Sequence, residues 1–287
     1  MPELPELQAH AERLQEGFGG AVLGGFRPIT FTALKTYAPA PEAAVGLALV
    51  AVGRRGKHLL VGFGETGDGE VAPAVTFVVH LMQGGRLTPD EKQSAKPRGG
   101  IARWSFEDGR ALLLTEQGTE RRAGVWVVAG SPEGQEPLLG LGPDADRLDA
   151  AGWAQVVAGQ SMRLHGLLRD QRIVAGIGRR LANEICHRAK LSPFANASKL
   201  TPDQVAALSD AARACIEESL ADERSRDVMV KSAERAGSVH HRVGEPCPVC
   251  GDAIRAVEYR SYTVAYCPTC QTGGKVLADN TTSKFLK

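Results

Sequence analysis

The chain lacks any long apolar run. None of its segments reaches the roughly 18 consecutive apolar residues of a membrane-spanning helix, and its first residues lack the basic and apolar blocks of a signal peptide. We therefore expect a cytoplasmic protein that makes no membrane contact. With 287 residues, of which 43% are hydrophobic and 23% charged, the chain is long enough for two modest domains that each have a core.

The chain also lacks a strong charge of either sign, because its formal net charge is +1. The overall charge therefore gives no indication of a nucleic-acid partner. Its distribution is more informative, since the segment 163–199 is rich in arginine and lysine and contains only two acids, Asp170 and Glu184. A local concentration of this kind is typical of a phosphate-binding surface, although a solvated helix face has the same composition.

Cysteine is scarce, and its placement is uneven. Four of the six cysteines form two Cys-x-x-Cys pairs, Cys247 with Cys250 and Cys267 with Cys270. This spacing allows a closed, tetrahedral four-thiolate zinc site, whereas redox pairs or disulfides are the alternative and suit a reducing cytosol less well. We predict one structural zinc ion and no organic cofactor, with a β-hairpin over 256–266 between the pairs. Cys186 and Cys215 lie in apolar helical patterns and are expected in the core.

Apolar periodicity divides the rest of the chain. Steps of three and four residues from Leu4 to Phe18 predict an amphipathic helix that ends at Gly19-Gly20. Short apolar runs between residues 21 and 128 predict an antiparallel sandwich. Its expected strands are 47–52, 58–63, 74–82, 101–106, 111–115 and 125–128. The expected later helices are 151–158, 163–170, 179–189 and 202–219, while 224–239 is polar and aperiodic.

These patterns predict an α+β protein. Its N-terminal β-sandwich with a long N-terminal helix covers 1–130, and a linker or hinge rich in glycine and proline covers 131–150. A helical domain follows over 151–240, and a zinc finger with a C-terminal tail covers 241–287.

The first six residues, Met1-Pro2-Glu3-Leu4-Pro5-Glu6, suggest a catalytic site. If Met1 is removed, which the small Pro2 permits, the chain begins with a secondary amine. The pKa of an α-amino group is about 7.7 to 8, so a useful fraction is unprotonated near neutral pH. Such an amine can form a Schiff base with a sugar carbon, and Glu3 and Glu6 are candidates for proton transfer beside it. Alternatively, these residues only begin a helix, with Pro5 at its first position.

Taken together, these features resemble the formamidopyrimidine-DNA glycosylase and endonuclease VIII family of base-excision repair enzymes. The resemblance rests on Met1–Glu6, Arg54-Arg55-Gly56-Lys57, His80-Leu81, Arg121-Arg122, 170–184 and 247–271. It implies a DNA glycosylase and abasic-site lyase that acts as a monomer on damaged double-stranded DNA in the nucleoid. It also implies that Lys57 contacts the lesion's phosphate and assists proton transfer, although a basic turn is often only a solvated loop.

The resemblance further implies a helix–two-turn–helix element and a set of DNA contacts. Two loops would enter the duplex to replace an extruded base. The implied DNA-binding residues are His80, Gln83, Arg121, Arg122, Gly176, Gly178, Arg179 and either Arg260 or Tyr262. In a regular strand, Arg260 and Tyr262 would share one face, and Met82 would point away from the face of Gln83.

Five positions depart from the family pattern. The family has methionine at Gln83, often phenylalanine at Ala123, asparagine at Arg179, arginine at Tyr262, and a lysine where this chain has His165. The first four of these departures favour, as an alternative, a paralogue that binds DNA lesions with weak or no glycosylase activity. Retention of Pro2, Glu3 and Lys57 favours the enzyme.

Overall fold

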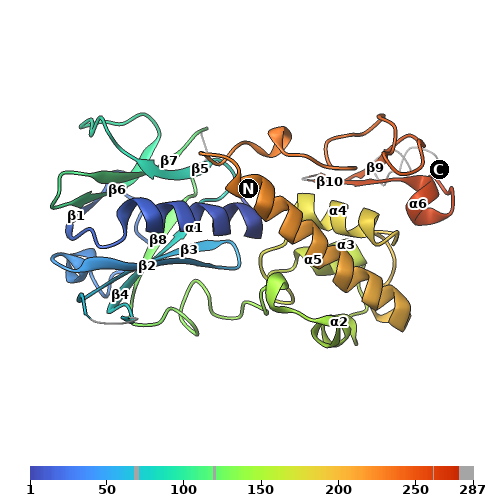
Figure 1. Ribbon diagram of the computed structural model, residues 1–287, viewed down its shortest axis with the longest axis horizontal. Coiled ribbons are helices and arrows are strands. Elements are labelled where there is room, and N and C mark those ends of the chain that lie inside the picture. The colour runs from blue at the N-terminus through green and yellow to red at the C-terminus, as the bar shows by residue number, and fades with distance from the viewer. Residues whose placement is uncertain (68–70, 119–120, 261, 278–287) are drawn as a thin grey trace. The chain divides into compact units, whose positions relative to one another are not determined.

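The computed structural model describes residues 1–67, 71–118, 121–260 and 262–277, so residues 278–287 of the predicted tail lie outside the described residues. The chain forms two compact units, Met1–Gly140 and Leu141–Lys287 (Figure 1). The boundary between them falls inside the segment 131–150, which the sequence predicts as a linker. The finer division into four parts stays a prediction. No helix in the described ranges is long and apolar enough to cross a bilayer.

The N-terminal unit begins with helix α1 (Leu4–Phe18) and continues as two antiparallel four-stranded sheets (Figure 1). One sheet has the strand order β1-β6-β7-β5 and the other β2-β3-β4-β8. The strands are β1 (Leu23–Pro28), β2 (Ala48–Arg55), β3 (His58–Gly64), β4 (Val75–His80), β5 (Gly85–Pro89), β6 (Gly100–Phe106), β7 (Ala111–Glu116) and β8 (Gly124–Ala129). This arrangement confirms the predicted β-sandwich with its N-terminal helix.

The sequence did not predict strands β1 and β5, whose glycines and prolines argue against strand structure. Each is an edge strand, because β1 pairs with β6 alone and β5 with β7 alone. Pro28 and Pro89 stand at the ends of these strands, where a missing N–H donor is tolerated. Pairing with an apolar neighbour therefore creates strands that local composition does not indicate.

Aromatic side chains from both sheets form the core of the N-terminal unit. The ring of Phe77 on β4 lies 5.7 Å from that of Trp104 on β6, and Phe26 on β1 lies 4.9 Å from Trp104. Phe18, at the end of α1, packs 5.2 Å from Phe106. These contacts join the helix and both sheets, and aromatic pairs at such distances add to the free energy gained by burial.

The C-terminal unit contains helices α2 (Ala150–Val157), α3 (Leu164–Arg169), α4 (Arg179–Arg188) and α5 (Pro202–Arg224). The hairpin of β9 (Arg255–Glu258) and β10 (Thr263–Tyr266) follows, and α6 (Pro268–Thr272) comes after it. Both the helical part and the predicted hairpin are confirmed, and Cys186 and Cys215 are buried. The short 3-10 turns in the described parts of both units are Pro41–Ala44, Ala145–Arg147, Ala197–Lys199 and Ser232–Glu234.

Helix α5 extends five residues beyond the predicted end at Ser219. Its last turn is polar, but Glu223 is buried and its carboxylate Oε1 accepts a 2.8 Å bond from Nε of the buried Arg235. Met229, between these two residues, is also buried. A buried ion pair thus replaces the apolar periodicity that normally marks a helix, and it fixes part of the aperiodic segment 224–239.

His10, on the buried face of α1, predicts a pH-dependent stability. Burial, followed by the charge of Arg13, lowers the pKa of His10 from 6.5 to about 4. The unfolded chain takes up this proton below pH 6.5 while the folded chain resists it, so the stabilising contribution is complete above pH 6.5 and is lost towards pH 4. The loss is about 3 kcal/mol, since one pKa unit corresponds to about 1.4 kcal/mol.

The test compares urea unfolding of wild type and His10→Gln from pH 7 to pH 4. The variant should show a shallower decrease in the free energy of unfolding over this interval. Because the carboxylates titrate in both proteins, they cancel in the difference. Parallel pH profiles would contradict the assignment.

Candidate functional site

The first turn of α1 fixes the positions of Pro2 and Glu3. Glu3 is the N-cap residue and forms a capping box with Glu6, an arrangement in which two terminal backbone donors are satisfied reciprocally. The Glu3 N–H donates to Glu6 Oε2 at 2.5 Å, and the Glu6 side chain is fully buried. The helix begins at Leu4, so Pro5 is its second residue and not, as predicted, its first. Pro2 is buried and Met1 exposed.

Lys57 lies in a two-residue turn between β2 and β3. Gly56 precedes it with φ 55°, a left-handed conformation that suits glycine at such a hairpin turn. The turn brings the half-buried Lys57 to the end of the sheet where His58 pairs with His80. The two imidazole rings are 4.7 Å apart.

The environment of His80 shows which groups meet at this end of the sheet. Burial lowers the pKa of His80 to about 4, and the positive charges of Lys57 and of the N-terminal amino group lower it as well. The N-terminus, the β2–β3 turn and the end of β4 therefore converge. Of the four predicted catalytic residues, Pro2, Glu3 and Lys57 belong to these converging segments, and Glu6 supports them through the cap.

His80 is neutral near pH 7 and has a defined tautomer. Its Nδ1 accepts a 3.1 Å hydrogen bond from the Met82 N–H, so the ring proton resides on Nε2. A neutral imidazole with Nε2–H can donate one hydrogen bond to an anionic group beside Lys57.

The loop after β4 differs from the prediction that a strand continues to Met82. Strand β4 ends at His80, and Met82 has φ 51° within a tight turn. A Cβ on Gly85 would lie 2.1 Å from the Leu81 carbonyl oxygen, so only glycine fits there. Strand alternation therefore does not place Met82 and Gln83 on opposite faces. Gln83 is exposed and Met82 half-buried.

The second predicted loop is anchored by Glu116, which sequence reasoning missed. The buried Glu116 carboxylate accepts hydrogen bonds from the N–H groups of Arg122, at 2.6 Å, and Ala123, at 2.7 Å. These bonds hold the C-terminal end of the loop and leave Arg121 and Arg122 exposed, whereas Ala123 is buried. The small side chain that replaces the family's phenylalanine packs inside the protein.

The turns between α3 and α4 are organised by Gln171, a second residue that sequence reasoning missed. Its Oε1 accepts from the Gly176 N–H at 2.9 Å, and its Nε2 donates to the carbonyls of Arg169 and Ile177. Gly176 has φ 98°, and Gly178 is the N-cap of α4. The N–H of Gly176, one of the implied DNA-binding residues, thus donates within the turn. Arg179 begins α4 and is half-buried.

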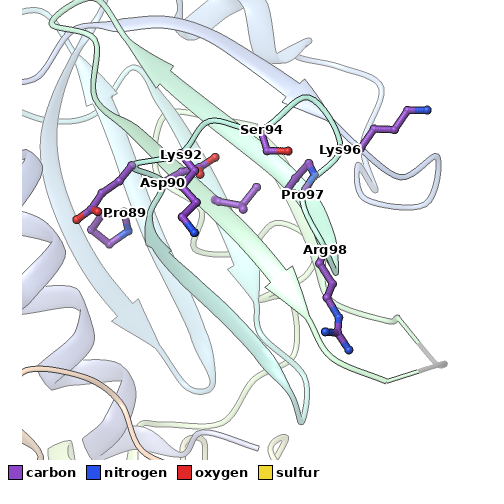
Figure 2. A pocket seen from close by; sticks show the side chains of 9 residues that line it. Pro89, Asp90, Lys92, Ser94, Lys96, Pro97 and Arg98 are labelled. Atoms are coloured by element: carbon purple, nitrogen blue, oxygen red, sulfur yellow. The ribbon is translucent and has the colours of Figure 1, made fainter.

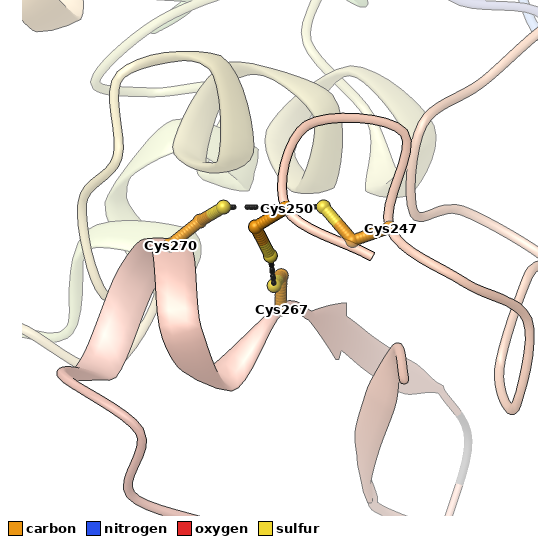
Figure 3. A group of neighbouring side chains, drawn as sticks. All are labelled: Cys247, Cys250, Cys267 and Cys270. Atoms are coloured by element: carbon orange, nitrogen blue, oxygen red, sulfur yellow. Dashed lines mark hydrogen bonds between the residues drawn. The ribbon is translucent and has the colours of Figure 1, made fainter. Parts of the chain in front are cut away.

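The four predicted zinc ligands lie together (Figure 3). Their Sγ atoms are all within 4.8 Å of one another, with Cys247 and Cys270 at 3.9 Å and Cys250 and Cys267 at 3.4 Å. Tetrahedral coordination with Zn–S bonds of about 2.3 Å requires sulfur separations of about 3.8 Å. The cluster therefore fits one structural zinc ion, which is confirmed as the metal of this site.

Helix α4 is connected to the zinc site by polar side chains. His187 Nε2 lies 3.3 Å from Cys247 Sγ, and Glu184 accepts from the N–H groups of Ser238, Val239 and His240 at 2.7, 3.1 and 2.8 Å. Gln271, in α6, donates to the Leu191 carbonyl. These bonds attach the zinc ribbon to the helix that follows Gly178.

Glu184 gives a second prediction. In Glu184→Ala, three backbone N–H groups that include the buried Val239 would lose their acceptor, at a cost of about 1–3 kcal/mol for each buried group left unsatisfied. We expect a decrease of roughly 2–4 kcal/mol in the free energy of unfolding. Urea titration measures it, and Glu217→Ala, which changes an exposed glutamate on α5, is the matched control. Equal stabilities of the two variants would contradict the anchoring role.

The tip of the zinc hairpin also differs from the prediction. Arg260 and Tyr262 lie in the connection between β9 and β10, not within a regular strand, so the expectation that they share a strand face does not apply. Arg260 is exposed, while Tyr262 is half-buried and stacks on Tyr259 with ring centroids 4.6 Å apart.

A separate pocket of about 390 Å³ lies at the β5–β6 connection (Figure 2). Lys92, Lys96 and Arg98 line it, and the buried ion pair between Arg103 and Asp90, at 2.7 Å, fixes its wall. None of the predicted site residues lines it.

Comparisons with known proteins agree with this architecture. Family models match at residues 1–126 (formamidopyrimidine-DNA glycosylase N-terminal domain), 139–229 (formamidopyrimidine-DNA glycosylase H2TH domain) and 244–273 (zinc finger found in FPG and IleRS). The formamidopyrimidine-DNA glycosylase of Chloroflexus aurantiacus is 30% identical over 285 residues, which cover 94% of this chain and 98% of the relative.

Two further proteins are similar. An uncharacterized formamidopyrimidine-DNA glycosylase-like protein of Mycobacterium tuberculosis is 41% identical over 162 residues, 56% of this chain and 100% of that protein. The crystal structure of the MutM (Fpg) protein from Thermus thermophilus is 26% identical in sequence. It superimposes with a TM-score of 0.78, covering 96% of this chain and 100% of that one.

The sandwich with its N-terminal helix, the helix–two-turn–helix element and the four-cysteine ribbon define a class of protein, the zinc-finger DNA glycosylases of base excision repair. Matches to the three parts extend from residue 1 to residue 273. The chain belongs to the formamidopyrimidine-DNA glycosylase and endonuclease VIII family.

Proposed function

We propose that this chain removes a damaged base from double-stranded DNA and then nicks the strand as an abasic-site lyase. The observation that carries the proposal is the position of Lys57, in the turn whose next residue, His58, pairs with His80, where the charge of the N-terminal amino group also acts. Removal of Met1 converts the Pro2 nitrogen from an amide into a secondary amine at this point. The same site then holds a nucleophile, a carboxylate and a cation.

The Pro2 amine attacks C1′ of the damaged nucleotide, and the bond to the base breaks. Glu3 delivers a proton as the base leaves, and the Pro2 nitrogen gives up its own proton. The C1′–O4′ bond then breaks with a proton taken up by O4′, and the product is an iminium ion that joins the Pro2 nitrogen to C1′ of the opened sugar. A covalent intermediate of this kind divides one difficult displacement into two easier steps. Glu6 acts through Glu3, because its buried carboxylate holds the Glu3 N–H.

The iminium ion acidifies the protons on C2′. Loss of one of them expels the 3′ phosphate by β-elimination, which breaks the strand. Lys57, in the turn before His58, neutralises the phosphate and assists proton transfer, and the neutral His80 donates through Nε2–H. Both groups act where negative charge develops, which is where fixed donors lower a barrier most.

DNA contacts are proposed at four places in the chain. The two loops contribute Gln83, Arg121 and Arg122. The helix–two-turn–helix contributes Gly178 and Arg179, with Gly176 shaping the turn. The zinc hairpin contributes Arg260, with Tyr262 shaping the hairpin tip through its stack on Tyr259. We further propose that the protein acts as a monomer in the cytoplasm, associated with the nucleoid.

Borohydride trapping tests the proposed function. Incubation of the processed protein with an abasic-site duplex and borohydride should reduce the iminium ion and give a stable covalent protein–DNA adduct, while the same reaction without reductant should nick the strand. If no abasic duplex yields an adduct, the lyase proposal is wrong. A panel of duplexes with oxidised purines, oxidised pyrimidines and bulky adducts then identifies the excised base.

A second candidate function is a paralogue that binds lesions with little or no chemistry. Gln83, Arg179 and Tyr262 favour it because they depart from the family pattern at DNA contacts, and the buried Ala123 offers no apolar wedge. Tight binding to an abasic duplex with neither adduct nor nick would support this candidate against the enzyme.

A further inference from the structure

Two arginines beside the tip of the zinc hairpin differ from the ion-paired arginines of their unit. Six arginines there form ion pairs with carboxylates: Arg172 with Asp170, Arg188 with Glu218, Arg213 with Asp210, Arg226 with Asp222, Arg235 with Glu223 and Arg242 with Glu245. Within the described ranges, Arg163 and Arg169 have no carboxylate at ion-pair distance. Both lie on or beside the short helix α3, within the basic segment 163–199.

Aromatic rings, not acids, hold the guanidinium of Arg169. Its Cζ lies 4.1 Å from the ring centroid of Tyr262. Tyr262 in turn stacks on Tyr259, with centroids 4.6 Å apart and an interplanar angle of 12°. The ring of His165, from the first turn of α3, lies parallel to Tyr262 at 6.2 Å. The hairpin tip and α3 therefore meet in one stack.

Arg163 is held by the same cluster at a different point. Its Nη1 donates a 2.7 Å hydrogen bond to the Tyr259 hydroxyl, and its Cζ lies 5.5 Å from the centroid of Phe194. The Arg163 side chain is nevertheless exposed, and Arg169 is half-exposed. Neither charge is neutralised by a described carboxylate, and both remain accessible to a ligand.

Stacking uses the face of a guanidinium and leaves its N–H donors available in the plane of the group. A stacked arginine also has fewer rotamers to lose when it binds, which reduces the entropic cost of each new hydrogen bond. Two such cations with no acidic partner make a site for an oxyanion, and a phosphate oxygen accepts charge-assisted bonds from guanidinium groups.

We propose that Arg163 and Arg169, held on the Tyr259–Tyr262 stack, bind one phosphate of the DNA backbone. The two side chains form a site that belongs to α3 and the hairpin tip jointly, with Tyr262 as a positioning residue for Arg169. The proposal rests on the proposed function only in that it takes DNA as the ligand.

The test measures affinity for a duplex with a tetrahydrofuran abasic analogue, which cannot be cleaved, at several salt concentrations. Arg169→Ala should lower the affinity about 10-fold, and the slope of log K against log salt should fall by about 1, because one phosphate contact is lost. Arg213→Ala, which removes an exposed but ion-paired arginine of α5, is the matched control and should change neither quantity.

Tyrosine variants separate positioning from a merely structural role. Tyr262→Phe keeps the stacked ring and should bind as wild type does. Tyr262→Ala should weaken binding about 3-fold, and Arg169→Ala combined with Tyr262→Ala should bind no more weakly than Arg169→Ala alone. Tyr259→Phe removes only the hydrogen bond to Arg163 and should give a smaller loss than Arg163→Ala.

The outcomes distinguish this proposal from the proposed function. If wild type traps on abasic DNA and Arg169→Ala leaves the salt slope unchanged, the phosphate site is wrong and the lyase stands. If wild type fails to trap but binds duplex with a slope that depends on Arg169, the lyase is wrong and the phosphate site stands. Weak binding by Tyr262→Phe, with an unchanged thermal unfolding midpoint, would overturn the stacking argument.

Discussion

Protein that keeps any residue in front of Pro2 should lose strand scission and borohydride trapping on abasic DNA. In such a protein the Pro2 nitrogen is an amide and cannot attack C1′. We expect the rate of adduct formation to fall on the order of 10³-fold or more, the scale seen when a covalent nucleophile is removed. DNA affinity should change little, because the proposed DNA contacts lie at other positions.

A cleavable extension before Pro2 allows the measurement within one preparation. The extended protein is assayed first, and the extension is then removed so that Pro2 becomes the first residue, as intact mass confirms. Activity should appear on cleavage. A third protein with the same extension at its C-terminus is the control for the added residues. The Pro2→Gly variant also begins with an amine once Met1 is removed, and it should still form the borohydride-trapped adduct, at a reduced rate. Undiminished nicking by the extended protein would rule out the N-terminal amine as nucleophile.

Loss of the zinc ion should greatly weaken DNA binding. Cys250→Ser removes one thiolate from an exposed ligand position, so packing changes little while the closed four-sulfur site is broken. Structural zinc supplies much of the folding free energy of a small ribbon. Without it the β9–β10 hairpin should lose its fixed position, and the α4 contacts made through His187 and Glu184 should weaken. We expect affinity for the abasic duplex to fall about 100-fold or more.

Zinc content by metal analysis, affinity by fluorescence anisotropy and thermal unfolding of the same samples test this prediction together. Cys215→Ala is the matched control, because Cys215 is buried on α5 away from the cluster. The control should keep one zinc per chain and wild-type affinity. A metal-free Cys250→Ser protein that binds DNA as wild type does would show that the ribbon is dispensable.

Features with local signals were predictable. The periodicity of Leu4–Phe18, the apolar runs of the sandwich and the spacing of the four cysteines each contain their structural cause within a few residues, and the structure agrees with each of them. The edge strands β1 and β5 have no such signal, because their partners β6 and β7 make them strands.

The supporting residues of the site were not predictable for the same reason. Glu116 and Gln171 bind backbone N–H groups within the loops that follow them, and Glu184 reaches residues more than fifty positions later in the chain. A side chain that anchors a loop in this way looks like any other polar residue in a sequence. The stack of Tyr262 on Arg169 likewise depends on α3 and the hairpin tip meeting in space.

The turn in the loop after β4 shows a different reason why prediction from sequence fails. The sequence pattern continues the strand to Met82, but the His80 imidazole accepts the Met82 N–H and the chain turns with φ 51°. A side chain here competes successfully with the strand for a backbone donor, and this competition depends on a tautomer that the sequence does not encode.

The reciprocal cap between Glu3 and Glu6 has a consequence for maturation. The hydrogen bonds of the cap involve only these two residues, so the helix is closed whether or not an initiator residue precedes Pro2. Removal of Met1 by a peptidase would therefore change the Pro2 nitrogen from an amide to an amine without weakening the Glu3–Glu6 cap. In the proposed mechanism, the new Pro2 amine is separated from the first residue of α1 by Glu3 alone, so activation should need no refolding.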